Sequence, residues 1–359
     1  MILASISKVF IPSAIAFFVG IIITPFIAGL LYKYKLWKQV ARKDDVDMPK
    51  DEEISAAFKG IHNMQDEVRT PRPGGLVVWV SVVITMFLVF LMSYFFPNQI
   101  TTKLNFLSRS QTLLPFFTLL AGGLIGFSDD MCSIFAKAPS FRNGFPRWLM
   151  ILIVSIVGLV SGIWFFSKLG VTAIHIPFVG QWELGILIIP LFLLVFLGTF
   201  SSGVIDGVDG LAGGVMTTIF GAFGTIAYFQ NQIDLAAFCA TIVGGLLVFL
   251  WFNIPPARFY LGETGMMALV FSLSIIVFMT DKVFVFLVIA FPLVITSISS
   301  FIQIISKRIL GPTRGKIFRI APLHHHFEAI GWSRAKITMR YWIISTMCAV
   351  MGIILAMIS

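Results

Sequence analysis

Ten apolar stretches, each long enough to cross a lipid bilayer as a helix, constrain this chain more than any other feature of its sequence. A crossing needs about 20 mainly apolar residues, because helical rise has to cover roughly 30 Å of hydrocarbon. The stretches lie near residues 11–32, 75–96, 112–128, 148–167, 184–203, 211–229, 235–252, 264–280, 283–306 and 341–358. Since 58% of the residues are hydrophobic and no stretch remains for a separate water-soluble core, we expect an all-α integral membrane protein with about ten transmembrane helices, in one domain over residues 1–359.

The basic residues predict how these helices are oriented. Lys and Arg concentrate in loops that stay in the cytoplasm, and 21 of the 26 basic residues lie in the loops after the odd-numbered stretches. The sequence therefore predicts cytoplasmic odd loops and N- and C-termini that both face outward. A positive inner face is usual for membrane proteins, so we expect a lipid bilayer and no nucleic acid as partner. One outer loop, residues 171–185, alternates apolar and polar positions around Pro177 and Gly180, which predicts a short hairpin.

Acidic side chains gather at the cytoplasmic ends of the predicted helices. A carboxylate inside the bilayer costs about 2.5 to 3.5 kcal/mol at the centre of a span, so it needs a partner or a watery cavity. Several carboxylates at the same depth in the membrane predict a shared active-site cleft on the cytoplasmic face. The six residues are Asp129, Asp130, Asp206, Asp209, Glu263 and Glu328.

The chemistry of such a site follows from its ligand type. Asp129 and Asp130 are neighbours, about 100° apart on a helix, so one can reach a cation while the other orients or acts as a base. Mg²⁺ prefers oxygen ligands and typically takes one or two protein carboxylates together with substrate phosphates. We therefore predict Mg²⁺ as cofactor, a diphosphate substrate, and close backbone approach to that ligand at glycines such as Gly207.

Three of the five histidines are consecutive, His324 to His326. On a helix they splay by about 100° each and cannot close a tetrahedral zinc site from one face. We expect one or two of the imidazoles to face phosphate or metal-bound water, while another packs. Basic residues that can neutralise phosphate oxygens precede them, namely Lys307, Arg308, Arg314, Lys316 and Arg319.

Four segments, "FSDD", "DGVDGLAGG", "WFNIPPARFYLGETG" and "APLHHHFE", resemble in order and spacing the hallmark segments of the polyprenyl-phosphate N-acetylhexosamine-1-phosphate transferases. The "HHHFE" form with its following "GW" is similar to the phospho-N-acetylmuramoyl-pentapeptide transferase branch. The resemblance implies that phospho-MurNAc-pentapeptide passes from UDP-MurNAc-pentapeptide to undecaprenyl phosphate, giving lipid I and UMP with Mg²⁺ required. It also implies a multi-pass protein of the bacterial plasma membrane that acts in peptidoglycan synthesis, and it leaves a homodimer open.

Motif by motif, the resemblance assigns roles to residues of this chain. It implies catalytic roles for Asp129, Asp130, Glu263 and His324, with Glu263 and Asp129 as metal ligands. Whether Asp129 acts as a base or forms a covalent intermediate stays open. Together with the patterns above, it implies that substrate or nucleotide is bound by Asp206, Gly207, Asp209, Asn253, Lys137, His325, His326, Arg69 and Arg72.

The chain departs from the family pattern at several of these positions. Glu263 stands where the family usually has Asp, which sets the charge one methylene farther from the backbone. Phe200 and Gly203 replace two asparagines ahead of Asp206. Arg72 replaces a threonine, and a basic residue usual a few positions upstream is Glu67, so Arg69 and Arg72 are candidates to supply that charge.

Three alternatives follow from these departures and from the membrane setting. A sister transferase would use another UDP-sugar such as UDP-GlcNAc, and a catalytically inactive homologue would only bind lipid. A transporter would instead carry acids near the bilayer midplane and inverted repeats. The acids of this chain lie at the ends of the predicted spans, which disfavours transport.

Overall fold

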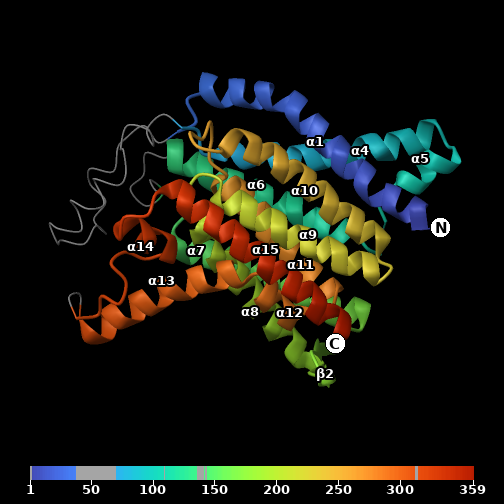
Figure 1. The fold of residues 1–359 in the computed structure, drawn as a ribbon. Helices are drawn as coiled ribbons and strands as arrows, with labels where there is room; N and C mark the ends of the chain where they lie inside the picture. The colour runs from blue at the N-terminus through green and yellow to red at the C-terminus, as the bar shows by residue number, and fades with distance from the viewer. Residues whose placement is uncertain (1, 38–69, 109, 136–140, 142–143, 312–313) are drawn as a thin grey trace.

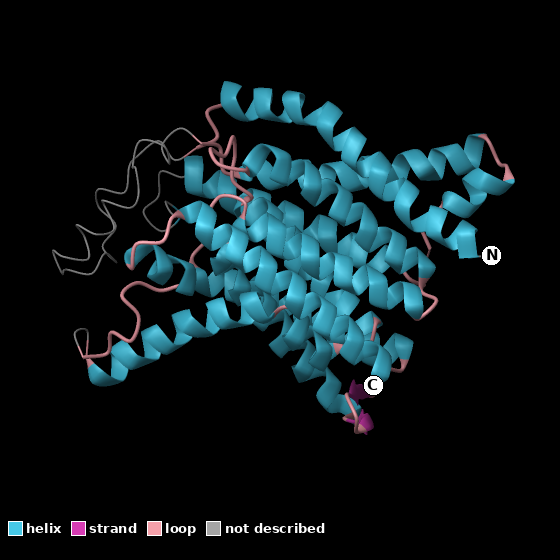
Figure 2. Ribbon diagram, in the orientation of Figure 1, coloured by secondary structure: helices cyan, strands magenta, loops and turns pink. Residues whose placement is uncertain are grey.

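The computed structural model describes residues 2–37, 70–108, 110–135, 141, 144–311 and 314–359. Most of them belong to helices (Figure 2). Ten of these helices are long and apolar enough to cross a membrane, as the sequence predicts. They comprise Ser5–Lys33, Pro73–Phe95, Leu113–Phe135, Arg147–Leu169, Gly185–Ile205, Leu211–Phe229, Ile233–Asn253, Gly262–Met279, Phe291–Leu310 and Arg334–Ile358.

The elements follow one another along the chain as shown in Figure 1. The long α-helices are α1 (Ile2–Lys33), α4 (Leu76–Phe95), α6 (Leu113–Phe135), α7 (Arg147–Leu169), α8 (Ile188–Ser201), α9 (Leu211–Phe229), α10 (Ile233–Asn253), α11 (Gly262–Met279), α13 (Phe291–Leu310) and α15 (Arg334–Ile358). The short elements are η1 (Pro73–Gly75), α5 (Gln99–Leu104), β1 (Ala173–Ile176), β2 (Gly180–Glu183), η3 (Gly185–Leu187), η4 (Ser202–Ile205), α12 (Val283–Ile289) and α14 (Leu323–Ala329).

Some helix ends differ from the sequence prediction. Helix α6 continues to Phe135, so its two aspartates lie within the last turns of a helix rather than beyond it. The predicted ninth span is interrupted at Ala290, with Pro292 in the first turn of the helix that follows. Helix α15 begins at Arg334, earlier than predicted, because the side chain of Ser333 accepts the N–H of Lys336 and caps it.

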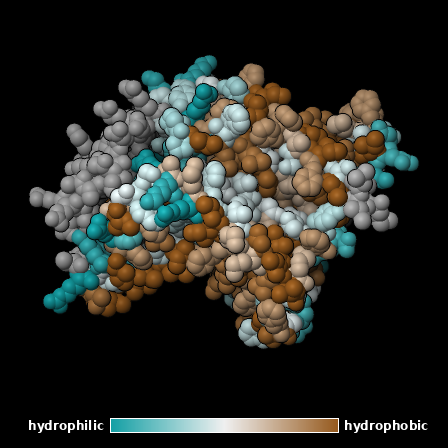
Figure 3. All heavy atoms as spheres, in the orientation of Figure 1, coloured by the Kyte–Doolittle hydropathy of each residue, from teal (hydrophilic) through white to brown (hydrophobic). Residues whose placement is uncertain are grey.

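The core is formed by helices α9, α10 and α11, while α1, α7, α13 and α15 lie around it. In the most apolar stretch of α11, 83% of the residues are buried, whereas the corresponding figure for α1 is 22%. The outer helices expose large apolar side chains such as Phe10, Phe18 and Phe26 of α1, and apolar residues dominate much of the face in Figure 3. Backbone polar groups in a bilayer must be satisfied within the protein, and helices satisfy them internally.

Helices α6 and α11 pack against each other so closely that only glycine fits at their contact. A Cβ added to Gly122 would lie 2.3 Å from the carbonyl oxygen of Met267, and one added to Gly126 would lie 2.0 Å from that of Glu263. Small residues that let helix backbones approach are typical of membrane helix pairs. This contact brings the acidic end of α6 against the first turn of α11.

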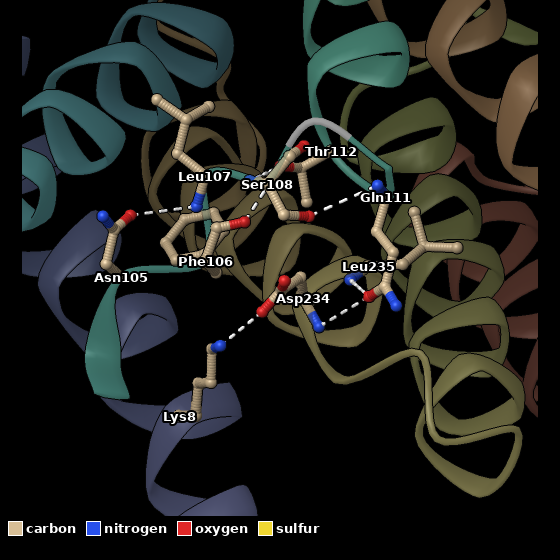
Figure 4. A network of polar contacts seen from close by, with 9 residues as sticks. All are labelled: Lys8, Asn105, Phe106, Leu107, Ser108, Gln111, Thr112, Asp234 and Leu235. Atoms are coloured by element: carbon tan, nitrogen blue, oxygen red, sulfur yellow. Dashed lines mark hydrogen bonds and ion pairs between the residues drawn. The ribbon is translucent and has the colours of Figure 1, made fainter. Parts of the chain in front are cut away.

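Polar contacts at the end of the bundle opposite this acidic region join α1, the turn before α6, and α10 (Figure 4). The ammonium of Lys8 pairs with the carboxylate of Asp234. The side-chain oxygen of Gln111 accepts the backbone N–H groups of Asp234 and Leu235, at 3.1 and 3.3 Å. Because the first N–H groups of a helix have no partner within it, Gln111 caps α10.

The predicted hairpin is present at the same end. Strands β1 and β2 are antiparallel, with His175 opposite Gln181. Asp281, in the turn after α11, accepts the backbone N–H of His175 and the side-chain amide of Gln181, both at 2.9 Å. At its tip Phe178 is 75% exposed.

Helix α13 projects from the bundle, and the chain after it folds back to form α14 (Figure 1). The returning segment is tied to α13 itself. Gln303 exchanges two hydrogen bonds with the backbone of Phe318, and the hydroxyl of Ser299 accepts the N–H of Leu323 at 2.9 Å. Helix α13 therefore carries the histidine-bearing helix.

Candidate active site

The two aspartates of α6 have different environments. Asp130 is 1% exposed, and its Oδ2 accepts the backbone N–H of Thr264 at 2.9 Å and the hydroxyl of Thr264 at 2.6 Å. Among the described residues, Asp129 accepts the backbone N–H of Phe145, at 2.5 Å. A Cβ on Gly144 would lie 2.7 Å from both of its carboxylate oxygens. Asp130 therefore fixes the first turn of α11, which leaves Asp129 with more lone pairs for a ligand.

The loop between η4 and α9 supplies the second pair of aspartates. Asp206 accepts the N–H of Gly262 at 2.9 Å, and Oδ2 of Asp209 accepts that of Ala257 at 3.3 Å. Gly262 has a φ of +64°, which favours glycine, and a Cβ there would lie 2.6 Å from Oδ2 of Asp130. Gly262 thus brings the loop against the α6 carboxylates.

Asn253 fastens this loop to the segment that leads into α11. Its side-chain oxygen accepts the N–H of Gly210 at 2.7 Å, and its amide donates to the carbonyl of Phe259 at 2.8 Å. Asn253 is buried, so both ends of its amide hold backbone. In this structure its contacts are those of a residue that shapes the loop.

Glu263 lies in the first turn of α11, beside the other carboxylates. Its charge interacts with those of Asp130, Asp129 and Asp206, and with the guanidinium of Arg72. The same guanidinium acts on both α6 aspartates and on Asp206. A single described arginine therefore faces four carboxylates.

The segment that carries Arg72 is held against the start of α11. Tyr260 donates its N–H to the carbonyl of Pro71 at 2.9 Å, and Gly75 donates to that of Leu261 at 3.0 Å. A Cβ on Gly262 would lie 2.5 Å from the carbonyl oxygen of Arg72. The backbone thus fixes where this positive charge enters the site.

The three histidines point in different directions, as their splay on a helix requires. His324 is 0% exposed, and its Nε2 lies 2.7 Å from where a Cβ of Gly207 would be. Nε2 of His325 lies 3.0 Å from the same point. His326 faces the preceding loop, where its Nδ1 accepts the N–H of Arg319 at 3.1 Å. Two imidazoles therefore approach the loop of Asp206 and Asp209.

Burial and neighbouring charges shift the acid–base behaviour of groups in these loops. Burial raises the pKa of Asp206 to about 6, and the charges of Asp130 and Asp209 act in the same direction, while the Gly262 N–H and Arg72 oppose it. Burial and the charge of Arg319 lower the pKa of His326. The pKa of Asp206 is therefore above that of an ordinary aspartate.

The donor groups fit a divalent cation that keeps part of its coordination for substrate. Among the described residues, no three His, Cys, Asp or Glu side chains form a ready metal cage. The charges of Asp129 and Glu263 nevertheless act on each other, and among the described residues Arg72 is the cation that acts on Glu263. This is the arrangement that suits Mg²⁺, which binds one or two carboxylates and substrate phosphates.

The structure brings together most of the residues that the sequence singled out. Asp129, Asp130, Asp206, Asp209, Glu263, Arg72, Gly207, His324 and His325 lie at one end of the bundle, linked by the contacts above. Arg69 and Lys137 lie outside the described residues. Near the positions of the two replaced asparagines, Ser201 and Ser202 donate their hydroxyls to carbonyls of their own helix.

Sequence reasoning missed several residues that shape the site. Thr264, Gly144 and Gly126 each touch a carboxylate or its backbone. Thr264 and Gly144 each follow a motif closely, but nothing in their spacing predicts the contact. Only "GGLIG" in α6, with Gly122 and Gly126 four residues apart, carries a recognisable signal of close helix packing.

Comparison with known proteins places these residues in a family. The model of glycosyl transferase family 4 matches residues 112–281. A phospho-N-acetylmuramoyl-pentapeptide-transferase of Geobacillus thermodenitrificans is 30% identical over 352 residues, which covers 96% of each chain. A protein of the same name from Geobacillus sp. WCH70 is 32% identical over 82% of this chain and 86% of its own. One from Clostridium perfringens strain 13 is 30% identical over 94% of this chain and 95% of its own.

Proposed function

The chain belongs to the phospho-N-acetylmuramoyl-pentapeptide transferase family, within glycosyl transferase family 4, and from this premise we propose the reaction that its site performs. It is a multi-pass membrane transferase. Phospho-MurNAc-pentapeptide passes from UDP-MurNAc-pentapeptide to undecaprenyl phosphate, and the products are lipid I and UMP. The observation that carries this proposal is the meeting of four carboxylates, Arg72 and two imidazoles around Gly207 and Gly262.

The reaction exchanges one phosphoanhydride bond for another. An oxygen of the lipid phosphate attacks the phosphorus that bears the sugar, and the bond from that phosphorus to the oxygen of UMP breaks. Mg²⁺, held by Glu263 and Asp129 together with the diphosphate, would supply positive charge to the phosphate oxygens and to the leaving UMP. The remaining rate acceleration comes from aligning the attacking lipid phosphate with the diphosphate of the nucleotide substrate, because phosphoryl transfer depends on positioning and electrostatics.

The residues of the chain divide the remaining tasks. Asp129, held by the N–H of Phe145, faces the acceptor phosphate and orients it or takes its proton. Asp130 keeps α6 and α11 in register through Thr264. Arg72 is the fixed cation that lets an anionic diphosphate approach so many carboxylates.

Two histidines, apart from the α6 aspartates, bind the nucleotide part of the substrate. His324 and His325 lie over Gly207, where the lack of a side chain allows a ligand close to the backbone. Asp206 and Asp209 flank this glycine on the nucleotide side. His326, bonded to the backbone of Arg319, shapes the loop instead.

We propose that this end of the bundle faces the cytoplasm of a bacterial cell. Lys and Arg are enriched in loops on that side, and the loops that carry Arg72, Arg258 and the histidines hold most of the basic residues of the chain. A water-soluble UDP-linked substrate is also available there.

The proposal is tested with purified protein, UDP-MurNAc-pentapeptide and undecaprenyl phosphate. We expect UMP release that requires Mg²⁺ and is abolished in Glu263→Ala. A parallel assay with UDP-GlcNAc should release no UMP. Release from UDP-GlcNAc alone would identify a sister transferase, and release from neither sugar would identify an inactive homologue.

A further inference from the structure

Glu328 is a buried carboxylate that none of the steps above uses. Its side chain is 3% exposed and bonds to two residues. Oε2 lies 2.6 Å from Nδ1 of His325, and Oε1 accepts the N–H of Nε of Arg334 at 2.9 Å. Burial alone would raise the pKa of Glu328, but the hydrogen bonds and charges of His325 and Arg334 hold it below its ordinary value. Glu328 is therefore an anion at neutral pH.

The ring of His325 connects this anion to the nucleotide side of the site. Its Nδ1 lies on Glu328, and its Nε2 lies 3.0 Å from where a Cβ of Gly207 would be. Gly207 itself is exposed, between Asp206 and Asp209. One ring nitrogen thus lies on a buried carboxylate, while the other lies beside the exposed Gly207.

A carboxylate on one imidazole nitrogen fixes both the orientation of the ring and the position of its proton. In this arrangement Nδ1–H of His325 donates to the first anion, the carboxylate of Glu328. A phosphate oxygen bound at Nε2 would be a second anion in contact with the same ring. An imidazolium between two anions donates one N–H to each. The geometry suits a phosphate group bound over Gly207.

We propose that Glu328 is a positioning residue that acts through His325, holding its ring so that Nε2–H donates to the diphosphate of the nucleotide substrate. The proposal rests on the proposed function, because it names the ligand group that His325 meets. Glu328 itself does not touch the substrate. Arg334 bonds to the other carboxylate oxygen, Oε1, and leaves Oε2 to His325.

The kinetic test measures UMP release by the purified full chain at varied UDP-MurNAc-pentapeptide. Because a ground-state contact with the diphosphate is lost, Glu328→Gln should raise KM about tenfold with kcat within about threefold of wild type. His325→Gln should raise KM similarly. In a double-mutant cycle, adding Glu328→Gln to His325→Gln should raise KM no further, since the carboxylate acts through the ring.

Arg334→Gln is the matched control, because it removes the other partner of Glu328 and leaves the bond to His325. We expect its KM to stay within about twofold of wild type. A purely structural role of Glu328 would lower the amount of active enzyme, and thus the apparent kcat, without moving KM. Unchanged KM in Glu328→Gln, independent effects in the double variant, or an equal rise in Arg334→Gln would overturn the proposal.

A spectroscopic test separates this proposal from the proposed reaction. Selective ¹⁵N labelling reports the protonation of the five histidine rings whether or not the protein turns over substrate. We expect one ring with a protonated, hydrogen-bonded Nδ1 that is absent in His325→Gln, altered in Glu328→Gln and retained in Arg334→Gln. The absence of such a signal overturns the positioning role, whereas wild-type protein that shows the signal but releases no UMP overturns only the reaction.

Discussion

The acidic side chains at the two ends of the bundle have opposite kinds of partner. At the end that carries the hairpin, Asp234 pairs with Lys8, and Asp281 accepts hydrogen bonds from His175 and Gln181. At the other end, four carboxylates crowd around Arg72. Acids of the first kind join separate elements and stabilise the fold. Acids of the second kind repel one another and are kept together by packing, which is why we propose that they are functional groups.

The contrast also shows what holds the crowded acids in place. Buried charges without opposite partners are costly, so the cost has to be offset elsewhere in the fold. Here the offset comes from the glycine contact of α6 with α11, and from hydrogen bonds that Thr264 and Gly262 donate to carboxylates. Strained electrostatics of this kind are expected where a site has to receive a cation and an anionic substrate.

The largest effect is expected when a carboxylate at the crowded end loses its charge. Asp129→Asn should lower the rate of UMP release at least about 100-fold, because the side chain keeps its shape but no longer supplies an anionic ligand. Asp281→Asn, at the hairpin end, should leave the rate within about twofold. Normal turnover in Asp129→Asn would remove this residue from the mechanism.

The next largest effect concerns the contact that holds the acids together. Gly126→Ala should lower the free energy of unfolding by about 1 to 3 kcal/mol, since the added methyl meets the Glu263 carbonyl, and UMP release should fall as α6 and α11 separate. The control is Gly221→Ala in α9, where nothing lies within 4 Å of the new methyl. Equal thermal stability of the two variants would show that the contact is not tight.

A third experiment uses the raised pKa of Asp206. Its pKa of about 6 in the folded chain exceeds the ordinary 3.8, so ionisation of Asp206 opposes folding fully above pH 6, and this opposition falls off gradually between pH 6 and pH 3.8. With EDTA present, Asp206→Asn should therefore be more stable than wild type at pH 7.5 by about 1 kcal/mol, allowing for solvent screening. The difference should shrink below pH 6 in thermal unfolding, and a constant difference would contradict the assigned shift.

The smallest effect is expected at the paired end. Lys8→Met should cost about 0.5 kcal/mol of stability, because both side chains of its pair with Asp234 are about one-fifth exposed. UMP release should stay within about twofold of wild type. Chemical denaturation of Lys8→Met, of Asp234→Asn and of the double variant gives the interaction energy of the pair. A loss of activity in Lys8→Met would contradict the distinction between stabilising acids at one end and functional acids at the other.

The sequence predicts the parts of this molecule that depend on local composition. Apolar length alone predicts the ten helices, and alternation around Gly180 predicts the hairpin. Both are confirmed. Splay on a helix predicts that His324 and His326 meet different surroundings, and the first lies against Gly207 while the second binds the backbone of Arg319.

What the sequence does not predict depends on elements that meet only in the folded chain. Asn253 stands in a motif that the resemblance associates with nucleotide binding, and the sequence does not show that its amide also joins two backbone segments. The two aspartates of "FSDD" look equivalent in sequence. They are distinguished by Thr264 from another helix, which bonds Asp130 and not Asp129. Such contacts require the packing of α6 on α11, and the glycine spacing in α6 signals close packing without showing which helix is the partner.

The attachment of α14 to α13 has a consequence for how the protein is made. About 60 residues separate Glu263, the last of the four crowded carboxylates, from His324. At about 5 to 20 residues per second, the ribosome therefore needs about 3 to 12 seconds to synthesise the chain from Glu263 to the histidines. During that interval the nascent chain already holds its crowded acids but has no imidazole beside them. Under the proposed function, a chain whose synthesis stops after α12 would be inert, and the enzyme would become active only when the final helices have entered the membrane.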